Sequence, residues 1–361
     1  MTTLTVEQQK EAFAERLFRD MLGAVTTANI AIGERLGLYS ILQAAGPLSP
    51  SGLATRAGIA ERYAREWLEQ QAADGVLEVA NQASDPSERQ YSLPAGHASI
   101  LADREDLDFM APFARLIMSG AAQLPGIVEA FQTGGGVPWD QYGDDMREAQ
   151  GDANRPLFLH QLAQEYLSAI PDVAAILGRD GEVRVAEIGS GMGWAAIGLA
   201  RTYSNVCVDG YDLDGPSVVR ANEHAEQAGV ADRVRFFNQD AASAEGTYDL
   251  VTAYECLHDM PRPVDVLAAM RSILAPGGAC IVMDERAGEE FTAPADEVER
   301  LLYGISVLVC LPDGMSHPPS VGTGTVIRPS TLRGYAQDAG FADVEALDLD
   351  HPLFRFYRLQ P

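Results

Sequence analysis

Apolar residues recur at intervals of three and four positions along the first third of the chain. The pattern is clearest over residues 7–42, where few glycines and no prolines interrupt it. Spacing of this kind predicts helical structure with one apolar face. An apolar stripe of this length must be covered, and we expect a second copy of the chain to cover it.

The pattern changes after this helical stretch to two short helices and two short β-like runs. The helices are predicted over 49–58 and 60–75 and meet at Gly58, and the runs 76–79 and 90–94 follow them. This order is typical of a winged helix-turn-helix. The segment that would enter DNA, "AERYAREWLEQQAAD", carries two arginines against four acidic residues. That balance argues against DNA binding and favours a packing or dimerisation module.

The next region is again mostly helical and is interrupted by "TGGGVPWDQYGDD", which is predicted to be a flexible loop. Its two aromatic residues, Trp139 and Tyr142, look exposed. The loop is either a linker between domains or a lid that carries substrate contacts, and the sequence leaves both open. We expect three regions: a helical winged-helix dimerisation domain (1–105), a helical linker and lid (106–165) and a catalytic domain (166–361) with a helical and loop insertion at 286–327.

Strands and helices alternate through the second half, which predicts a parallel sheet covered on both faces. The predicted strands are 183–189, 205–213, 234–240, 248–255 and 279–285, with 342–350 and 353–359 as an antiparallel closing pair. The predicted helices between them are 194–203, 216–229, 263–274 and 330–340.

Composition places the chain among ordinary globular proteins. Its 361 residues are 47% hydrophobic and 22% charged, enough for two domains with sizeable cores. The start, "MTTLTVEQQK", lacks a signal peptide's apolar stretch, and no run approaches the ~18 apolar residues that span a bilayer. We therefore expect a cytoplasmic protein without a membrane partner.

Charge and cysteine content narrow the possible partners further. The 26 basic and 52 acidic residues give a formal net charge of −26, which repels a phosphate backbone and argues against nucleic acid. The cysteines form no C-x-x-C pair, so we expect reduced thiols and no metal site; they are Cys207, Cys256, Cys280 and Cys310.

The stretch "VAEIGSGMGWA" places three glycines on alternate positions after a predicted strand. No lysine follows Gly193, which excludes a Walker phosphate loop, and Trp194 stands where a dinucleotide fingerprint has its third glycine. The glycines still allow a tight turn and a close approach of the backbone to a ligand.

Polar residues follow the strands at the edge where ligands bind in open α/β sheets. Strand one ends in Glu187. Asp212 ends strand two, 21 residues after Gly191, close to the ~20 spacing of an acid that accepts from ribose hydroxyls. Asp240, after strand three, is suited to accept from the exocyclic amine of a purine. Together they predict an adenosine-bearing ligand, with Asp209 and Asp214 as competitors of Asp212.

With these residues in view, segment 183–285 resembles a class I S-adenosylmethionine-dependent methyltransferase. The whole chain is similar to actinobacterial small-molecule methyltransferases with an N-terminal winged-helix domain, in stretches such as "EIGSGMG" and "YDLVTAYECLHDMPRPVDVLAAMRSILAPGG". The resemblance implies an α/β fold with a Rossmann-like seven-stranded sheet and S-adenosylmethionine as cofactor. It implies a cofactor site formed by Glu187, Gly189, Ser190, Gly191, Gly193, Asp212, Leu213, Asp240, Ala241 and Tyr254. In it, the glycines line the methionine part, Asp212 takes the ribose, and Asp240 with Ala241 takes the adenine.

The motif "CLHDM" supplies a candidate catalytic base, His258. Plant phenol O-methyltransferases have a similar His-Asp pair here and an acid after strand five, matched by Asp284, that orients the histidine. A neutral imidazole with an ordinary pKa of ~6.5 would suit proton removal near pH 7. The other possibility is that His258 only caps the next helix or packs against the cofactor. Trp139, Tyr303 and His317 are candidates for substrate contact, with His317 a possible second base.

The function expected is therefore methyl transfer to a small-molecule acceptor, foremost a hydroxyl, in specialised metabolism. Nitrogen and carbon acceptors stay open. Two other functions stay open as well: non-methylating chemistry that uses the cofactor for cyclisation, decarboxylation or hydroxylation, and a ligand-sensing regulator, which rests only on the winged-helix pattern.

Overall fold

A computed structural model describes residues 4–81 and 85–361 of the chain. These residues fall into two compact units that divide between Met118 and Ser119. Among the described residues, no helix combines the length and the apolar character that crossing a membrane requires.

The first unit begins with the predicted long helix, α1. Thr5 forms a capping box with Gln8 at its start, and Gly37, with φ +65°, separates α1 from the next helix, so the helical stretch 7–42 is broken near its end. The elements in order are α1 (Val6–Arg35), α2 (Leu38–Ala45), α3 (Pro50–Ala57), α4 (Glu61–Ala73), β1 (Glu78–Asn81), β2 (Gln90–Ser92) and α5 (Ala95–Leu101).

The winged-helix prediction is confirmed within this unit. Helix α3 ends at Gly58 in the left-handed conformation, and β1 pairs antiparallel with β2. Residues 82–84 of the predicted wing lie outside the described residues. Trp67 packs edge-on against Tyr39 at 5.3 Å between ring centroids, inside an apolar core shared by α2, α3 and α4.

A seven-stranded sheet organises the second unit, in the order β5-β4-β3-β6-β7-β9-β8. The first five strands of this order are parallel, and β9 runs antiparallel between β7 and β8, as predicted for the closing pair. The strands are β3 (Val183–Ile188), β4 (Val206–Asp212), β5 (Val234–Asn238), β6 (Tyr248–Tyr254), β7 (Leu274–Glu285), β8 (Asp343–Ala346) and β9 (Phe354–Gln360).

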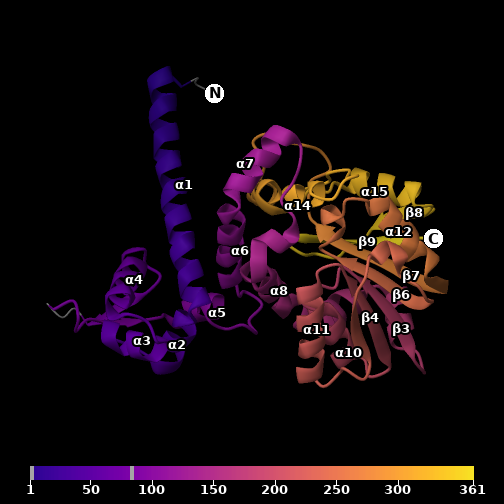
Figure 1. The fold of residues 1–361 in the computed structure, drawn as a ribbon, viewed down its shortest axis with the longest axis horizontal. Coiled ribbons are helices and arrows are strands. Elements are labelled where there is room, and N and C mark those ends of the chain that lie inside the picture. The colour runs from indigo at the N-terminus through magenta and orange to yellow at the C-terminus, as the bar shows by residue number, and fades with distance from the viewer. Residues whose placement is uncertain (1–3, 82–84) are drawn as a thin grey trace. The chain divides into compact units, whose positions relative to one another are not determined.

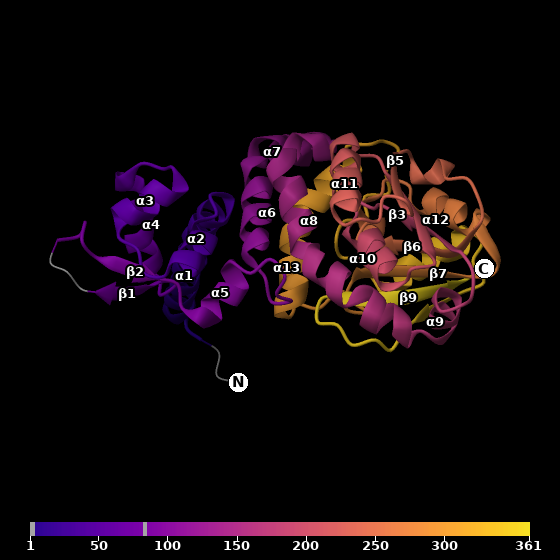
Figure 2. The same ribbon diagram turned by 90° about the horizontal axis from the view of Figure 1, so that it is seen from below.

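Helices cover both faces of the sheet because alternate residues of its strands are apolar on each side. Val183 and Val185 of β3 pack into one core, and Ala186 and Ile188 into the other. Figures 1 and 2 show α10 and α11 on one face and α12 and α15 on the opposite face. These helices are α10 (Trp194–Thr202), α11 (Gly215–Gln227), α12 (Pro263–Ser272) and α15 (Pro329–Asp338).

Two further helical groups contact each other within the second unit; α6, the first helix of one group, spans the division between the units. Tyr142 donates its hydroxyl hydrogen to the Leu308 carbonyl at 2.9 Å and is only 5% exposed. The expectation of an exposed Tyr142 is therefore wrong, because the ring is buried and its hydroxyl donates to a backbone carbonyl. The first group is α6 (Ala111–Ala122), α7 (Leu124–Thr133), η1 (Trp139–Tyr142), α8 (Gly143–His160), η2 (Leu162–Tyr166), η3 (Leu167–Ala169) and α9 (Pro171–Leu177). The second is α13 (Glu297–Ile305), η6 (Ser306–Cys310) and α14 (Leu311–Met315).

Candidate cofactor and catalytic site

The glycine turn lies between the end of β3 and the start of α10. Gly189, Gly191 and Gly193 have φ values of +69°, +49° and +80°. A Cβ on Gly189 would lie 2.6 Å from the Cys256 sulfur, and one on Gly193 would lie 2.5 Å from a ring carbon of Phe236. Neither position has room for a side chain, so the turn requires glycine both for its backbone angles and for its packing.

Asp212 closes the turn from the neighbouring strand. One carboxylate oxygen accepts from the Gly191 N–H at 2.7 Å and the other from the Asp214 N–H at 2.8 Å. The competing acids have other partners: Asp209 accepts from the Tyr248 hydroxyl at 2.9 Å, and Asp214 pairs with Arg147 at 2.7 Å. In the described part of the chain, the Asp212 carboxylate accepts only from backbone N–H groups, so no basic side chain neutralises its charge. Burial raises the pKa of its carboxyl.

The next strand brings Asp240 and Ala241 to the same edge of the sheet. Asp240 begins the short turn η4 (Ala241–Ser243), where its carboxylate accepts from the Ala242 N–H at 2.9 Å. The Arg262 guanidinium lies 3.7 Å from the other carboxylate oxygen. Both Asp212 and Asp240 thus stand at carboxyl ends of adjacent parallel strands, the place that the sequence predicts.

Three other predicted cofactor residues are buried close to the turn. Glu187 is 4% exposed, and burial raises its pKa to about 8, against the lowering effect of a backbone bond from Ala196. The Ser190 hydroxyl is buried and has no hydrogen-bond partner among the described residues. The Tyr254 ring packs 6.0 Å from that of Phe158, and burial raises the pKa of its hydroxyl. Leu213, in contrast, is mostly exposed.

His258 lies on η5 (Leu257–Asp259), directly beyond β6, and Asp284 lies near the end of the neighbouring strand β7. The two are buried, and the imidazole Nδ1 lies 2.6 Å from an Asp284 carboxylate oxygen. This hydrogen bond occupies Nδ1, and Nε2 lies 3.3 Å from an Asp259 carboxylate oxygen. The structure thus brings together the two predicted catalytic residues.

The charge state of His258 differs from the expectation. Burial by itself lowers the pKa of the imidazole, but the carboxylates of Asp259 and Asp284 outweigh burial and hold the pKa well above its usual value. The expectation of an ordinary pKa is therefore wrong. The raised pKa favours the protonated ring, and the basic form gains population as the pH rises.

Several residues around His258 were missed by the sequence analysis. Glu255 is the one non-glycine residue with a positive φ in the described ranges, at +50°, and burial raises its pKa to about 7. Asn154 of α8 donates a short side-chain hydrogen bond to it. Burial, followed by the Glu255 charge, raises the pKa of Glu285 well above its usual value. Glu255 and Glu285 are sequence neighbours of His258 and Asp284, whereas nothing in the pattern points to Asn154.

The structure brings two of the predicted substrate residues together and places the third elsewhere. Asp313 of α14 accepts from the Trp139 backbone N–H at 2.8 Å and lies 3.9 Å from Nε2 of His317. Burial, and then the charge of Asp259, raises the pKa of Asp313 to about 7. Tyr303 instead accepts at its hydroxyl from Arg328 at 3.1 Å and packs against Phe291.

Comparison with known proteins decides the family. Residues 158–346 match the family model described as a methyltransferase domain. The chain belongs to this methyltransferase family. Residues 24–103 match an Rv2258c-like winged HTH domain, in agreement with the first unit.

Relatives and solved structures agree with the assignment. A ubiquinone biosynthesis O-methyltransferase from Psychrobacter arcticus is 28% identical over 246 residues, covering 65% of this methyltransferase and 89% of the relative. The 27-O-demethylrifamycin SV methyltransferase of Amycolatopsis mediterranei is 34% identical over 147 residues, which cover 38% of this chain and 53% of the relative.

The fold matches solved structures over nearly the whole chain. Mitomycin 7-O-methyltransferase MmcR gives a TM-score of 0.68 at 20% identity, over 98% of this chain and 99% of that one. Human N-acetylserotonin methyltransferase, solved with S-adenosylmethionine, gives a TM-score of 0.69 at 16% identity. The match covers 96% of this chain and 97% of the human one. The chain is an S-adenosylmethionine-dependent methyltransferase with a seven-stranded Rossmann-like sheet and an N-terminal winged-helix domain.

Proposed function

We propose that this methyltransferase acts on a hydroxyl group of a small molecule in specialised metabolism. The observation that carries the proposal is the buried His258–Asp284 pair at the strand edge that also holds the glycine turn and Asp212. Because Nδ1 of His258 is hydrogen-bonded to Asp284, Nε2 is the nitrogen that would take the proton of the acceptor hydroxyl. Two relatives in sequence, named ubiquinone biosynthesis O-methyltransferase and 27-O-demethylrifamycin SV methyltransferase, support the same acceptor atom.

The cofactor residues would be those at the strand ends. The glycine turn offers backbone close to a ligand, Asp212 would accept from the ribose hydroxyls, and Asp240 with Ala241 would contact the adenine. Glu187, Ser190, Leu213 and Tyr254 complete the proposed set. When bound, S-adenosylmethionine supplies an electrophilic methyl group, so the protein has chiefly to hold the acceptor in line with it and away from water.

Methylation of a hydroxyl requires a group that takes up the hydroxyl proton. Nε2 of His258 would take the hydroxyl proton, while Asp284 fixes the ring through Nδ1 and stabilises the imidazolium that results. Trp139 and His317, which meet at Asp313, would contact the substrate. Tyr303 would contact it only if the substrate extends to the Arg328 side of α13.

Cofactor turnover tests the proposal. The purified enzyme is incubated with S-adenosylmethionine and a panel of phenols, enols and matched amines, and both S-adenosylhomocysteine and the methylated product are measured. We expect the two in equal amounts, with hydroxyl acceptors preferred. A product formed without S-adenosylhomocysteine would support the non-methylating alternative, and a preference for amines would contradict the hydroxyl.

Burial of Glu187 predicts that cofactor binding releases a proton. In the protein without cofactor, the Glu187 carboxyl has a pKa of about 8 and is mostly protonated at pH 7. The positive charges of S-adenosylmethionine would lower that pKa. The bound state then holds fewer protons, so affinity rises between pH 7 and 8, by at most about tenfold per pH unit for one proton.

Calorimetry in buffers of different ionisation enthalpy measures the proton release directly. Glu187→Gln, which keeps the shape of the side chain but cannot ionise, should abolish the release and flatten the dependence of affinity on pH. Binding to the wild type without proton release would remove Glu187 from the set of groups that respond to the cofactor.

We further propose that residues 1–105 form a homodimerisation module, 106–165 the linker and lid, and 166–361 the cytoplasmic catalytic domain with its insertion at 286–327. Helix α1 carries one continuous stripe of exposed apolar side chains at helical spacing: Phe13, Leu17, Phe18, Met21, Leu22 and Val25. Phe13 and Phe18 are 61% and 58% exposed. Surfaces of this kind mark interaction sites, and a self-complementary stripe fits a second copy of the chain.

The dimer prediction is tested by charge substitutions on this stripe. Light scattering should report a dimer for the wild type at micromolar concentration and a monomer for Phe18→Glu combined with Leu22→Glu. Arg19→Glu, on α1 but outside the stripe, is the matched control and should stay dimeric. A monomeric wild type, or salt-sensitive binding to DNA, would contradict the assignment.

A further inference from the structure

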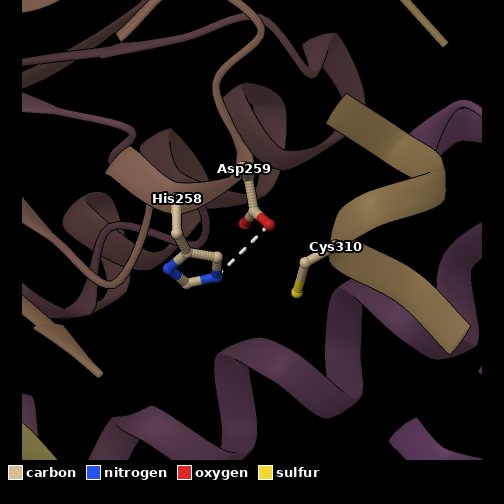
Figure 3. A group of neighbouring side chains, drawn as sticks. All are labelled: His258, Asp259 and Cys310. Atoms are coloured by element: carbon tan, nitrogen blue, oxygen red, sulfur yellow. Dashed lines mark ion pairs between the residues drawn. The ribbon is translucent and has the colours of Figure 1, made fainter. Parts of the chain in front are cut away.

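Three potential metal ligands meet at the proposed base, two from adjacent positions and one from a distant part of the sequence. His258 and Asp259 lie on η5, and Cys310 is the last residue of η6, a π-helical segment in the insertion. One ligand atom from each side chain lies within 4.8 Å of the other two. Figure 3 shows the imidazole facing Asp259, with the Cys310 sulfur turned toward the two of them.

The geometry suits a small tetrahedral ion. Bonds of ~2.0–2.3 Å from Zn²⁺ place neighbouring ligand atoms about 3.3–3.8 Å apart. Nε2 of His258 lies 3.3 Å from an Asp259 carboxylate oxygen, and the Cys310 thiol interacts with both side chains. One pair already has the spacing of zinc ligands, and a small movement of Cys310 would complete the set.

We propose that Nε2 of His258, a carboxylate oxygen of Asp259 and the sulfur of Cys310 form a Zn²⁺-binding site. An ion bound there would occupy Nε2, the atom proposed to take the proton of the acceptor. Imidazole, carboxylate and thiolate are the three ligand types of zinc proteins, and three protein ligands with an open fourth position are typical of accessible zinc sites. Binding displaces the proton from Nε2 and the proton from the thiol, and the resulting thiolate and carboxylate neutralise the ion.

The surroundings of the three ligands support a cation. Asp284 accepts from Nδ1 at 2.6 Å, which orients the ring and directs Nε2 outward, in the way that a carboxylate supports a zinc-bound histidine. Glu255 and Glu285 are buried nearby and act on the imidazole electrostatically. Two carboxylates, Asp259 and Asp284, contact the single imidazole, and a divalent ion would compensate their charge.

Zinc and the acceptor hydroxyl would compete for one atom. Nδ1 is occupied by Asp284, so Nε2 either takes the acceptor proton or binds the ion. Zinc is therefore expected to inhibit methyl transfer and chelators to restore it. This inhibition rests on the proposed role of His258 as the base, whereas the binding of the metal does not.

Cobalt(II) is a suitable probe because it takes zinc sites and gives a charge-transfer absorption when a thiolate binds it. The protein without a histidine tag is titrated with Co²⁺ and then with Zn²⁺, and bound zinc is measured after dialysis. We expect one ion per chain and a thiolate band that zinc displaces. Cys310→Ser should lose the band, Asp259→Asn should weaken binding, and Cys207→Ser, a cysteine outside the site, should match the wild type.

The outcomes test the metal site and the base role of His258 separately. Absence of a thiolate band, or zinc binding that is unchanged in both Cys310→Ser and Asp259→Asn, would overturn the metal site. The two ligand variants are independent, so misfolding of one, seen by circular dichroism, leaves the other as the test. The ratio of transfer rates with and without zinc is then compared between wild type and variants. Zinc bound at this site without inhibition would support the site and contradict the base role of His258.

Discussion

Replacing His258 by alanine is expected to lower the rate of methyl transfer to a hydroxyl acceptor by ~10²- to 10⁴-fold, the usual contribution of a positioned general base. The ring is buried and its Nδ1 is bonded to Asp284, so Nε2 alone can accept the proton. The rate is measured in single turnovers at saturating S-adenosylmethionine, with a chelator present, on the alkaline side of neutrality, where the neutral ring is more populated.

The control for this prediction is cofactor affinity, which should be nearly unchanged in His258→Ala because none of the proposed cofactor contacts passes through the imidazole. Asp284→Asn should cause a smaller loss, since the amide weakens the orientation of the ring and keeps the base. A rate that does not change in His258→Ala, with folding and affinity intact, would reduce the residue to packing. Transfer would then depend on proximity alone, as expected for an acceptor that is already nucleophilic.

Local signals predict most of the fold. The alternation of apolar residues, the glycine at 58 and the glycine turn at 189–193 each act over a few residues, and the structure places helices, wing and parallel strands accordingly. The same holds for Asp212, Asp240 and Asp284. Each lies at or just beyond the carboxyl end of a strand, and parallel strands end at one edge of the sheet, so position along the chain is enough to bring them together.

Contacts made by packing between distant segments could not be predicted in this way. Asn154 reaches Glu255, and Cys310 reaches His258, from helices whose sequences carry no periodic signal for those partners. Tyr142 looks exposed in a glycine-rich loop, yet the helix that carries Leu308 buries it. In each case a side chain meets a partner whose position depends on the placement of a whole helix.

The pKa of His258 shows a second kind of limit. Burial and two carboxylates act on the ring in opposite directions, and their balance depends on distances that the sequence does not contain. The motif "CLHDM" shows Asp259 beside the histidine, but in a regular strand the two side chains would point to opposite sides. Only the tight turn η5 brings the carboxylate of Asp259 to 3.3 Å from Nε2.

Replacing Asp212 by alanine is expected to cost S-adenosylmethionine binding about 1–3 kcal/mol, or roughly 5- to 150-fold in Kd. Removing the carboxylate takes away the proposed ribose acceptor, which lies beside the exposed Leu213. It also removes the hydrogen bond from the Gly191 N–H and so loosens the glycine turn. Asp212→Asn keeps one acceptor oxygen and should lie between the alanine variant and the wild type.

Calorimetric titration with S-adenosylmethionine and with S-adenosylhomocysteine measures the loss for both ligands, which share the ribose and differ in the charge at sulfur. A similar loss for both is expected, because the ribose hydroxyls are common to them. Asp209→Asn is the matched control: this acid accepts from Tyr248 and Arg184, away from the turn, so its loss should lower the melting temperature and leave affinity unchanged. Equal affinity in wild type and Asp212→Ala would remove the ribose role from Asp212. A loss in Asp209→Asn alone would transfer that role to Asp209, since the two acids compete for it in the sequence.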